Sequence, residues 1–240
     1  GGWFTELARQ VTAGLDACGI RACPGDVDPM HPNWRRTAAA WAREIDRVLH
    51  HPSRRDAMLA THYLDMRVIH GDTFLFEPLR HRALETGRHQ EPLVTALADQ
   101  ARALPTPLGF FRQFVLEDSG EHADTLDLKK RGLLPIVALA RIFALHAGSD
   151  ARGTVDRLRA AEGAGVITEA TATNLIDAWF YIAGVRTRHQ AQQIRGGRDP
   201  DNALDPATLS GLERRHLKTA FRLVAGARKA APAHVGRTHG

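Results

Sequence analysis

The sequence is poor in cysteine and aromatic residues, and it has no long hydrophobic run. Its two cysteines, Cys18 and Cys23, are too few for a disulfide framework and lack the partners of a zinc site. This favours a reducing, cytoplasmic setting. Aromatic residues make up only 6% of the chain, and no secretory signal or membrane-spanning segment is evident.

Familiar catalytic motifs are absent as well. The chain has no P-loop, no dinucleotide-binding glycine motif, no zinc-protease motif and no serine-hydrolase elbow. Function therefore has to be inferred from less regular features.

The composition that is present is that of an ordinary globular protein with a basic bias. Of the 240 residues, 43% are hydrophobic and 25% are charged, and the net charge is +5. The basic residues are mostly arginines scattered among acids, which suits anionic small molecules and does not favour nucleic acid. The chain begins with Gly1 inside a predicted helix, so we expect it to be a piece of a longer polypeptide.

One apolar segment is predicted to form the central helix of the fold. Between Leu133 and Leu145 the only polar side chain is Arg141. A helix that is apolar on every side must be surrounded by other elements, so this one is predicted to be the axis of a helical core. Pro135 suits its first turn and Gly148 offers a left-handed end.

Three cations, Lys129, Lys130 and Arg131, come just before this helix. A helix N-terminus with free N–H groups and nearby cations attracts phosphate or carboxylate. The alternative is a solvated basic turn that forms salt bridges with Asp124 and Asp127. Composition does not decide between them.

Periodicity and capping signals predict a mainly helical chain. Besides the central helix, the predicted helices span 2–18, 33–51, 53–60, 72–87, 92–104, 154–162, 168–195 and 210–229. An alternating segment, 63–69, predicts a strand, and 110–117 with 125–128 predicts a short hairpin.

The longest predicted helix carries polar groups at the end of an apolar stripe. The face that Trp179 and Ile182 begin extends to His189 and Gln193, and Arg188 and Gln190 lie in the same turns. Such groups either reach into a site or are satisfied donors of the core. A lone histidine there is more often structural, but the neighbouring arginines suit an anion pocket.

Two sets of carboxylates are candidates for metal chemistry. Asp65 lies on the predicted strand, as a metal ligand or as a salt-bridge partner of Arg67. Asp26 and Asp28 form a D-x-D pair, but they sit in a proline-rich loop with no strand before them. We therefore interpret that pair as a surface turn.

Several short motifs together resemble a known family. In order along the chain they are Cys23-Pro24-Gly25, Leu64-Asp65-Met66-Arg67 with Gly71-Asp72, Pro107-Leu108-Gly109-Phe110-Phe111, Thr125-Leu126-Asp127-Leu128-Lys129-Lys130-Arg131-Gly132, Arg188-His189-Gln190, and Leu209-Ser210-Gly211-Leu212 with Leu217-Lys218. They resemble the nucleotidyltransferases of unassigned function found in bacteria behind cyclic nucleotide-binding and CBS domains. That family is similar to the PII-protein uridylyltransferases.

The resemblance implies a helical bundle preceded by the C-terminal remnant of a polymerase-β-like α/β domain. The remnant would span 1–72, the helical substrate-binding domain 73–230, and a disordered tail 231–240. Asp65 matches the position of a third catalytic, metal-binding carboxylate. The Gly-Ser turn and D-x-D strand of the family would lie upstream. The loop also departs from the family pattern, with Asp26-Val27-Asp28-Pro29 where the family reads Gly-Val-Met-Ala.

The implied activity is transfer of a nucleotidyl group from an NTP, with Mg²⁺, to a protein or small-molecule acceptor in signal transduction. This belongs to a full-length parent, and we expect no turnover from the piece alone. The alternatives are a regulatory helical module that binds a partner protein and, less favoured, a basic nucleic-acid binder; a homodimer is left open. The anion site would combine Lys129, Lys130 and Arg131 with Arg188, His189 and Gln190, if their two helices pack side by side.

Overall fold

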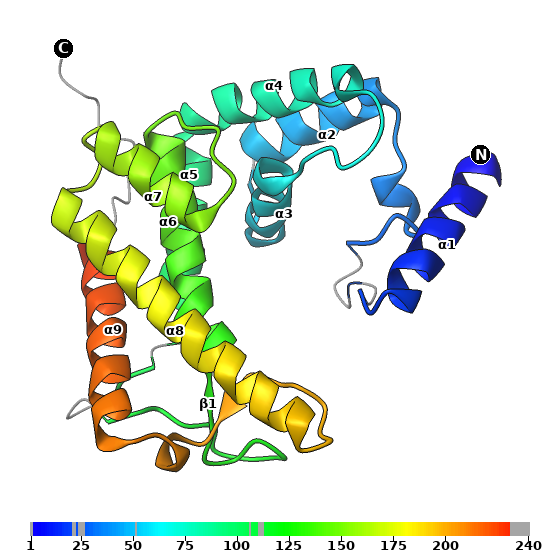
Figure 1. Cartoon of the computed structure of the whole chain (residues 1–240). Helices are drawn as coiled ribbons and strands as arrows, with labels where there is room; N and C mark the ends of the chain where they lie inside the picture. Colours follow the sequence, from blue (N-terminus) through cyan, green and yellow to red (C-terminus); the bar gives the residue numbers. More distant parts are fainter. Residues whose placement is uncertain are drawn as a thin grey trace.

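The computed structural model describes residues 2–20, 23, 27–50, 52–105, 107–109 and 113–230, which form nine α-helices and one small antiparallel sheet (Figure 1). The mainly α fold is confirmed. The helices are α1 (Gly2–Ala17), α2 (Ala38–His50), α3 (Arg54–Asp65), α4 (Glu77–Arg88), α5 (Glu91–Ala103), α6 (Leu134–His146), α7 (Thr154–Gly163), α8 (Glu169–Arg195) and α9 (Gly211–Ala230). None of these helices is long and apolar enough to span a bilayer.

Helix α6 is the axis that its apolar sequence predicts. Ile136 and Leu139 are fully buried in a hydrophobic cluster shared with α7, α8 and α9, whereas Ile142 and Leu145 belong to a second cluster shared with α2 to α5. Figure 1 shows α6 between these two groups of helices. Because α6 has a core on both sides, its one charged side chain, Arg141, must find a partner within the protein.

The C-terminal group follows the capping signals of the sequence. The hydroxyl of Thr168 accepts a hydrogen bond from the Thr171 N–H at 3.2 Å and begins α8. Before α9, the Ser210 hydroxyl accepts from the Glu213 N–H at 3.2 Å, and the Glu213 carboxylate accepts from the Ser210 N–H at 2.9 Å. This reciprocal capping box confirms the predicted start of the last helix.

The predicted strand 63–69 is wrong. Ser53 and Asp56 form a capping box that begins α3, and the helix continues to Asp65. Tyr63 and Leu64 lie in the last turn of this helix and are both buried, at 4% and 3% exposure. The helical spacing of Ala57, Ala60 and Leu64 on one buried face outweighed the short alternation that follows.

Two helix starts are displaced from their predicted positions. Asn33 lies inside a short 3₁₀ turn, Pro32–Trp34, and α2 begins only at Ala38. Asp72 caps another 3₁₀ turn, Thr73–Leu75, by accepting from the Phe74 N–H at 2.8 Å, and α4 begins at Glu77. In both places Asn or Asp satisfies a local turn as readily as a helix.

The predicted hairpin is replaced by a different pairing. Phe110, Phe111 and Arg112 lie outside the described residues. Glu117 does exchange backbone hydrogen bonds with Asp124 and Thr125, at 2.9 and 2.8 Å. Strand β1 (Leu126–Asp127), however, pairs antiparallel with β2 (Ala203–Leu204), which follows α8. A partner so distant along the chain gives no local turn signal.

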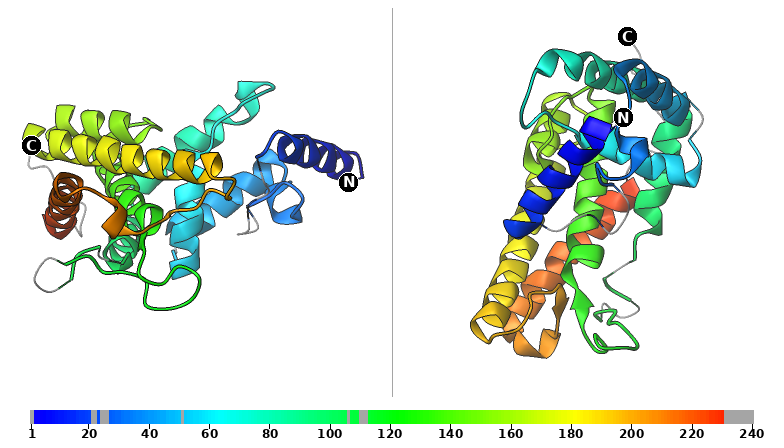
Figure 2. Two further views of the ribbon diagram at one scale, coloured as in Figure 1. Left: turned by 60° about the horizontal axis from the view of Figure 1, so that its bottom comes forward. Right: turned by 90° about the vertical axis from the view of Figure 1, so that its right-hand side faces the viewer.

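Helix α1 lies apart from the other helices (Figures 1 and 2). Ala8 is its one buried residue among those described, and Trp3 and Phe4 are 67% and 62% exposed. The predicted boundary at residue 72 falls between α3 and α4, which share one hydrophobic cluster. The predicted tail 231–240 lies outside the described residues.

Candidate functional site

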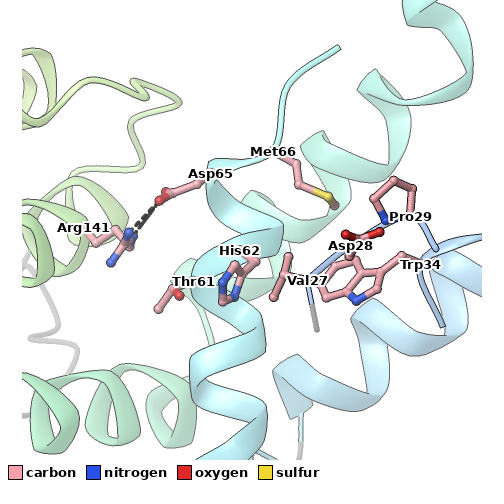
Figure 3. A pocket seen from close by; sticks show the side chains of 9 residues that line it. All are labelled: Val27, Asp28, Pro29, Trp34, Thr61, His62, Asp65, Met66 and Arg141. Carbon is pink, nitrogen blue, oxygen red and sulfur yellow. Dashed lines mark hydrogen bonds and ion pairs between the residues drawn. The ribbon is translucent and has the colours of Figure 1, made fainter. Parts of the chain in front are cut away.

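A pocket of about 390 Å³ opens beside the C-terminal end of α3 (Figure 3). The loop before α2 contributes Val27, Asp28, Pro29 and Trp34, α3 and the residue after it contribute Thr61, His62, Asp65 and Met66, and α6 contributes Arg141. The volume lies within the range of small-molecule sites. Apolar walls with a few polar groups are also typical of such sites.

The aromatic wall of the pocket is held by its neighbours. The Trp34 ring lies 5.8 Å from Trp41, 6.1 Å from Tyr63 and 6.3 Å from His62, between ring centroids. Tyr63 is buried, and burial raises the pKa of its hydroxyl to about 12, so it stays neutral. Trp34 is therefore an anchored indole at the edge of a cavity, a surface on which a flat ring can stack.

The polar end of the pocket is an ion pair between Asp65 and Arg141. Arg141 donates from Nε to both carboxylate oxygens, at 3.2 and 3.0 Å, and from Nη2 to Oδ2 at 2.6 Å. A second guanidinium, Arg157 of α7, donates from Nη2 to Oδ1 at 2.5 Å. Asp65 thus ties the end of α3 to both α6 and α7.

The charge state of Asp65 follows from these contacts. Burial alone would raise the pKa of this carboxyl, but hydrogen bonds and charge from Arg141 and Arg157 outweigh burial and hold it below its ordinary value. Asp65 is therefore ionised at neutral pH. Its salt-bridge partners are not Arg67, the neighbour suggested by the sequence, but arginines far along the chain.

The described residues around Asp65 do not fit a metal ion. No group of three or more His, Cys, Asp or Glu side chains in this part of the structure could hold one. Both oxygens of Asp65 already accept from guanidinium groups, which would repel a cation. The catalytic, metal-binding role of Asp65 stays a prediction of the family resemblance.

Of the D-x-D pair, Asp28 lies at the pocket and Asp26 lies outside the described residues. Asp28 accepts from the Met30 N–H at 2.6 Å, an Asx-type turn. Asp28 therefore lies in a local turn, as we interpreted the D-x-D pair from the sequence.

The basic turn before α6 is built differently from its prediction. Residues Leu128–Leu133 form a π-helical turn, η4, and the carboxylate of Asp127 accepts the Lys130 N–H at 2.7 Å. That contact satisfies one of the backbone donors expected to face an anion. Lys129 and Lys130 are exposed, whereas Arg131 pairs with Glu117 at 2.9 Å rather than with Asp124 or Asp127.

The polar groups of α8 contact the loop that follows this helix. His189 Nε2 lies 3.1 Å from Asp201 Oδ1, and Gln190 donates to the Asp201 carbonyl at 3.0 Å. Arg188 is mostly exposed and lies 3.5 Å from Glu213. His189 and Gln190 thus make contacts within the protein. This is the structural role that the sequence analysis gave as the alternative to an anion site.

The two halves of the predicted anion site are connected through packing and backbone contacts. A Cβ at Gly132 in η4 would lie 2.9 Å from Ile182 of α8, so only glycine allows this close approach. Leu128 donates its N–H to the Asn202 carbonyl at 3.0 Å, and the Asn202 side chain accepts from Arg186 at 2.6 Å. The basic turn therefore packs against α8, and the convergence of its cations with Arg188, His189 and Gln190 on one ligand stays a prediction.

Trp34, His62 and Arg141 were missed as site residues by the sequence reasoning. Arg141 did carry a signal, because a single charge in an otherwise apolar helix needs a partner. No such signal marks Trp34 or His62, since what places them at a cavity is the approach of α3 to the preceding loop.

Comparison with known proteins places the chain in a family. A family model described as "Putative nucleotidyltransferase DUF294" matches residues 1–55, and one described as "Putative nucleotidyltransferase substrate binding domain" matches residues 91–235. The second match covers more than half of the chain, so the protein belongs to this second family, the one described as "Putative nucleotidyltransferase substrate binding domain". No curated protein and no solved structure matches it.

Proposed function

We propose that this chain binds a substrate for nucleotidyl transfer, either the nucleotide or the acceptor, in the pocket between Trp34 and Arg141. The observation that carries the proposal is the composition of that pocket. Its loop residues, from Val27 to Trp34, fall in the segment matched as a nucleotidyltransferase, and Arg141 falls in the segment matched as a substrate-binding domain. Ligand sites form preferentially where two such parts meet.

The chemistry of the lining supports a ligand with a flat ring and a negative group. Trp34 offers a stacking face, worth roughly 1–3 kcal/mol for a nucleobase. Arg141 offers a planar fork that matches phosphate or carboxylate oxygens. His62 Nδ1 lies 2.9 Å from the Met58 carbonyl, so a neutral ring carries its proton there and presents Nε2 as an acceptor.

The proposal extends to a larger setting that the family resemblance suggests. In a full-length bacterial parent, Mg²⁺ and an NTP would supply the reacting phosphoryl group for signal transduction in the cytoplasm. The basic set Lys129, Lys130, Arg131, Arg188, His189 and Gln190 would then attract the anionic acceptor. Its support is the exposure of Lys129 and Lys130 on a turn that packs against α8.

The test is calorimetric titration of the chain with ATP and UTP. Trp34→Leu removes the stacking face and should weaken binding by about tenfold or more, given the roughly 1–3 kcal/mol of one stacked base. Phe180→Leu is the matched control, because Phe180 is an exposed aromatic of α8 outside the pocket lining and its replacement should change nothing. Equal affinity of wild type and Trp34→Leu, with both folded, would contradict the proposal.

A second candidate function is a regulatory module that binds a partner protein. Helix α1 favours it, because Phe4, Leu7, Val11 and Leu15 form an exposed apolar stripe on that helix. Under this function ATP and UTP would not bind. Val11→Glu would abolish any self-association or partner binding detected by sedimentation.

A further inference from the structure

Two arginines from separate helices meet at Asp65, which lines the pocket, and a third lies near them. Arg141 of α6 and Arg157 of α7 both donate to Asp65. Arg80 of α4 donates to the carbonyl of Asp150, and Arg157 donates to the carbonyl of the next residue, Ala151, at 2.9 Å. Because they come from separate helices, these guanidinium groups are brought together only by the tertiary fold.

The cluster has more positive than negative charge where it is buried. Arg80 and Arg157 are each only 5% exposed, and among the described residues Asp65 joins Arg157 to Arg141. Asp150 lies 3.7 Å from Arg80 but is 83% exposed, so water screens its charge. Two of the three cations therefore share one partly buried anion, and the third, Arg80, pairs with an exposed carboxylate.

A further observation concerns the hydrogen bonding of Arg80. The Nε of Arg80 is buried and has no hydrogen-bond partner among the described residues. A buried charged donor without an acceptor is costly, and proteins rarely leave one without a ligand or a function.

We infer that Arg80, Arg141 and Arg157 form a phosphate subsite, and that Asp65 takes the place of the phosphate when no ligand is bound. The ligand class is a compound with a terminal phosphate group, whose oxygens and double charge satisfy more guanidinium donors than one carboxylate can. The inference rests on the proposed function in one respect: the phosphate group would enter through the proposed pocket, which Asp65 and Arg141 line (Figure 3).

The position of Asp65 permits its displacement. It is the last residue of α3, and the next residue, Met66, has an extended backbone. A terminal helical turn opens at little cost compared with a helix interior. The side chain is also 34% exposed, so a phosphate can approach it from the pocket.

The experiment is titration of inorganic phosphate at constant ionic strength into wild type, Asp65→Asn and the matched control Asp150→Asn. Asp65→Asn removes the competing charge and should tighten phosphate binding about tenfold, the value of one charge-assisted hydrogen bond. Asp150→Asn, which changes the exposed carboxylate near Arg80, should bind as wild type does. Phosphate should also raise the melting temperature of Asp65→Asn more than that of wild type.

A second variant keeps the test decisive if Asp65→Asn folds poorly. Arg141→Gln should abolish phosphate binding in the wild-type background, whereas Arg159→Gln, which changes an exposed arginine of α7 paired with Glu162, should preserve it. No gain in Asp65→Asn, or undiminished binding in Arg141→Gln, would overturn the inference. Loss of Mg²⁺ binding on Asp65→Asn would instead assign Asp65 to a metal.

The result is separable from that of the proposed function. Inorganic phosphate has no ring to stack, so Trp34→Leu should leave its affinity unchanged even while ATP and UTP binding weaken. If phosphate binds as inferred but Trp34→Leu does not affect nucleotides, the subsite stands and the nucleotide assignment fails. Titration of O-phosphoserine alongside ATP then tells a phosphorylated side chain from a nucleotide.

Discussion

The two basic regions of this protein use their charge in opposite ways. Around Asp65, two guanidinium groups from separate helices share one partly buried carboxylate, and the buried Arg80 lies near them with the exposed Asp150 as its partner. In the turn before α6 and on α8, Lys129 and Lys130 are exposed, and Arg131 and Arg188 each pair with one carboxylate of a neighbouring segment.

The difference shows that the number of cations does not by itself make an anion site. Charges that lie close together in the low-dielectric interior of a protein interact strongly, whereas exposed charges are screened by water and salt. We therefore expect the Asp65 region to respond to single substitutions. The basic turn should respond mainly to ionic strength and to large anionic partners.

The strongest test of this contrast replaces one arginine in each region by methionine. Arg157→Met should lower the free energy of unfolding by about 1.5–3 kcal/mol, since it removes buried hydrogen bonds to Asp65 and to the Ala151 carbonyl while Arg141 still pairs with Asp65. Arg188→Met should change it by less than about 1 kcal/mol, because its contact with Glu213 is exposed. Urea unfolding measures both, and equal losses would remove the distinction.

The basic turn should be sensitive to packing rather than to charge. Gly132→Val places side-chain atoms where a Cβ already lies 2.9 Å from Ile182, so it should destabilise the protein by about 1–3 kcal/mol. Gly226→Ala in α9 is the control, because a Cβ there has open space and should be neutral or stabilising. Thermal melts of both variants check this, and a tolerated valine at position 132 would show that η4 is loosely packed.

The pH dependence of stability should come in part from Asp65. Its folded-state pKa lies below the ordinary value, so the stability it contributes is fully present above the unfolded pKa of about 3.9 and is lost as pH falls through the folded pKa. Acid unfolding of Asp65→Asn should be less steep over this range than that of Asp150→Asn. Identical acid transitions would contradict the assignment.

The smallest stability effect is expected from Lys130→Ala combined with Arg188→Ala. Both side chains are exposed, so the free energy of unfolding should change by no more than about 0.5–1 kcal/mol. If these residues attract the anionic substrate, the same variant should weaken nucleotide or phosphoprotein binding by well over about tenfold. Unchanged affinity with a lowered melting temperature would leave them a purely structural role.

Much of the helical frame could be predicted from local sequence. The apolar run around Leu139 predicted a helix buried on all sides, and Thr168 and Ser210 predicted where α8 and α9 begin. These features depend on contacts within a few residues, such as a cap or a buried stripe. The short alternation at 63–69 led to a wrong strand prediction for the same reason. A pattern taken over a few residues does not include the buried helical face that α3 begins upstream.

The candidate pocket and its arginine cluster could not be predicted in this way. Asp65 meets Arg141 across 76 positions and Arg157 across 92, and neither arginine has a local signal that names its partner. The family matches themselves rest on sequence alone. Local sequence thus determined the helices, their caps and the apolar axis, because hydrogen bonding and periodic burial act over one or two turns. Only tertiary packing decided which charges meet around Asp65 and which remain in water, because that depends on how α3, α4, α6 and α7 come together in space.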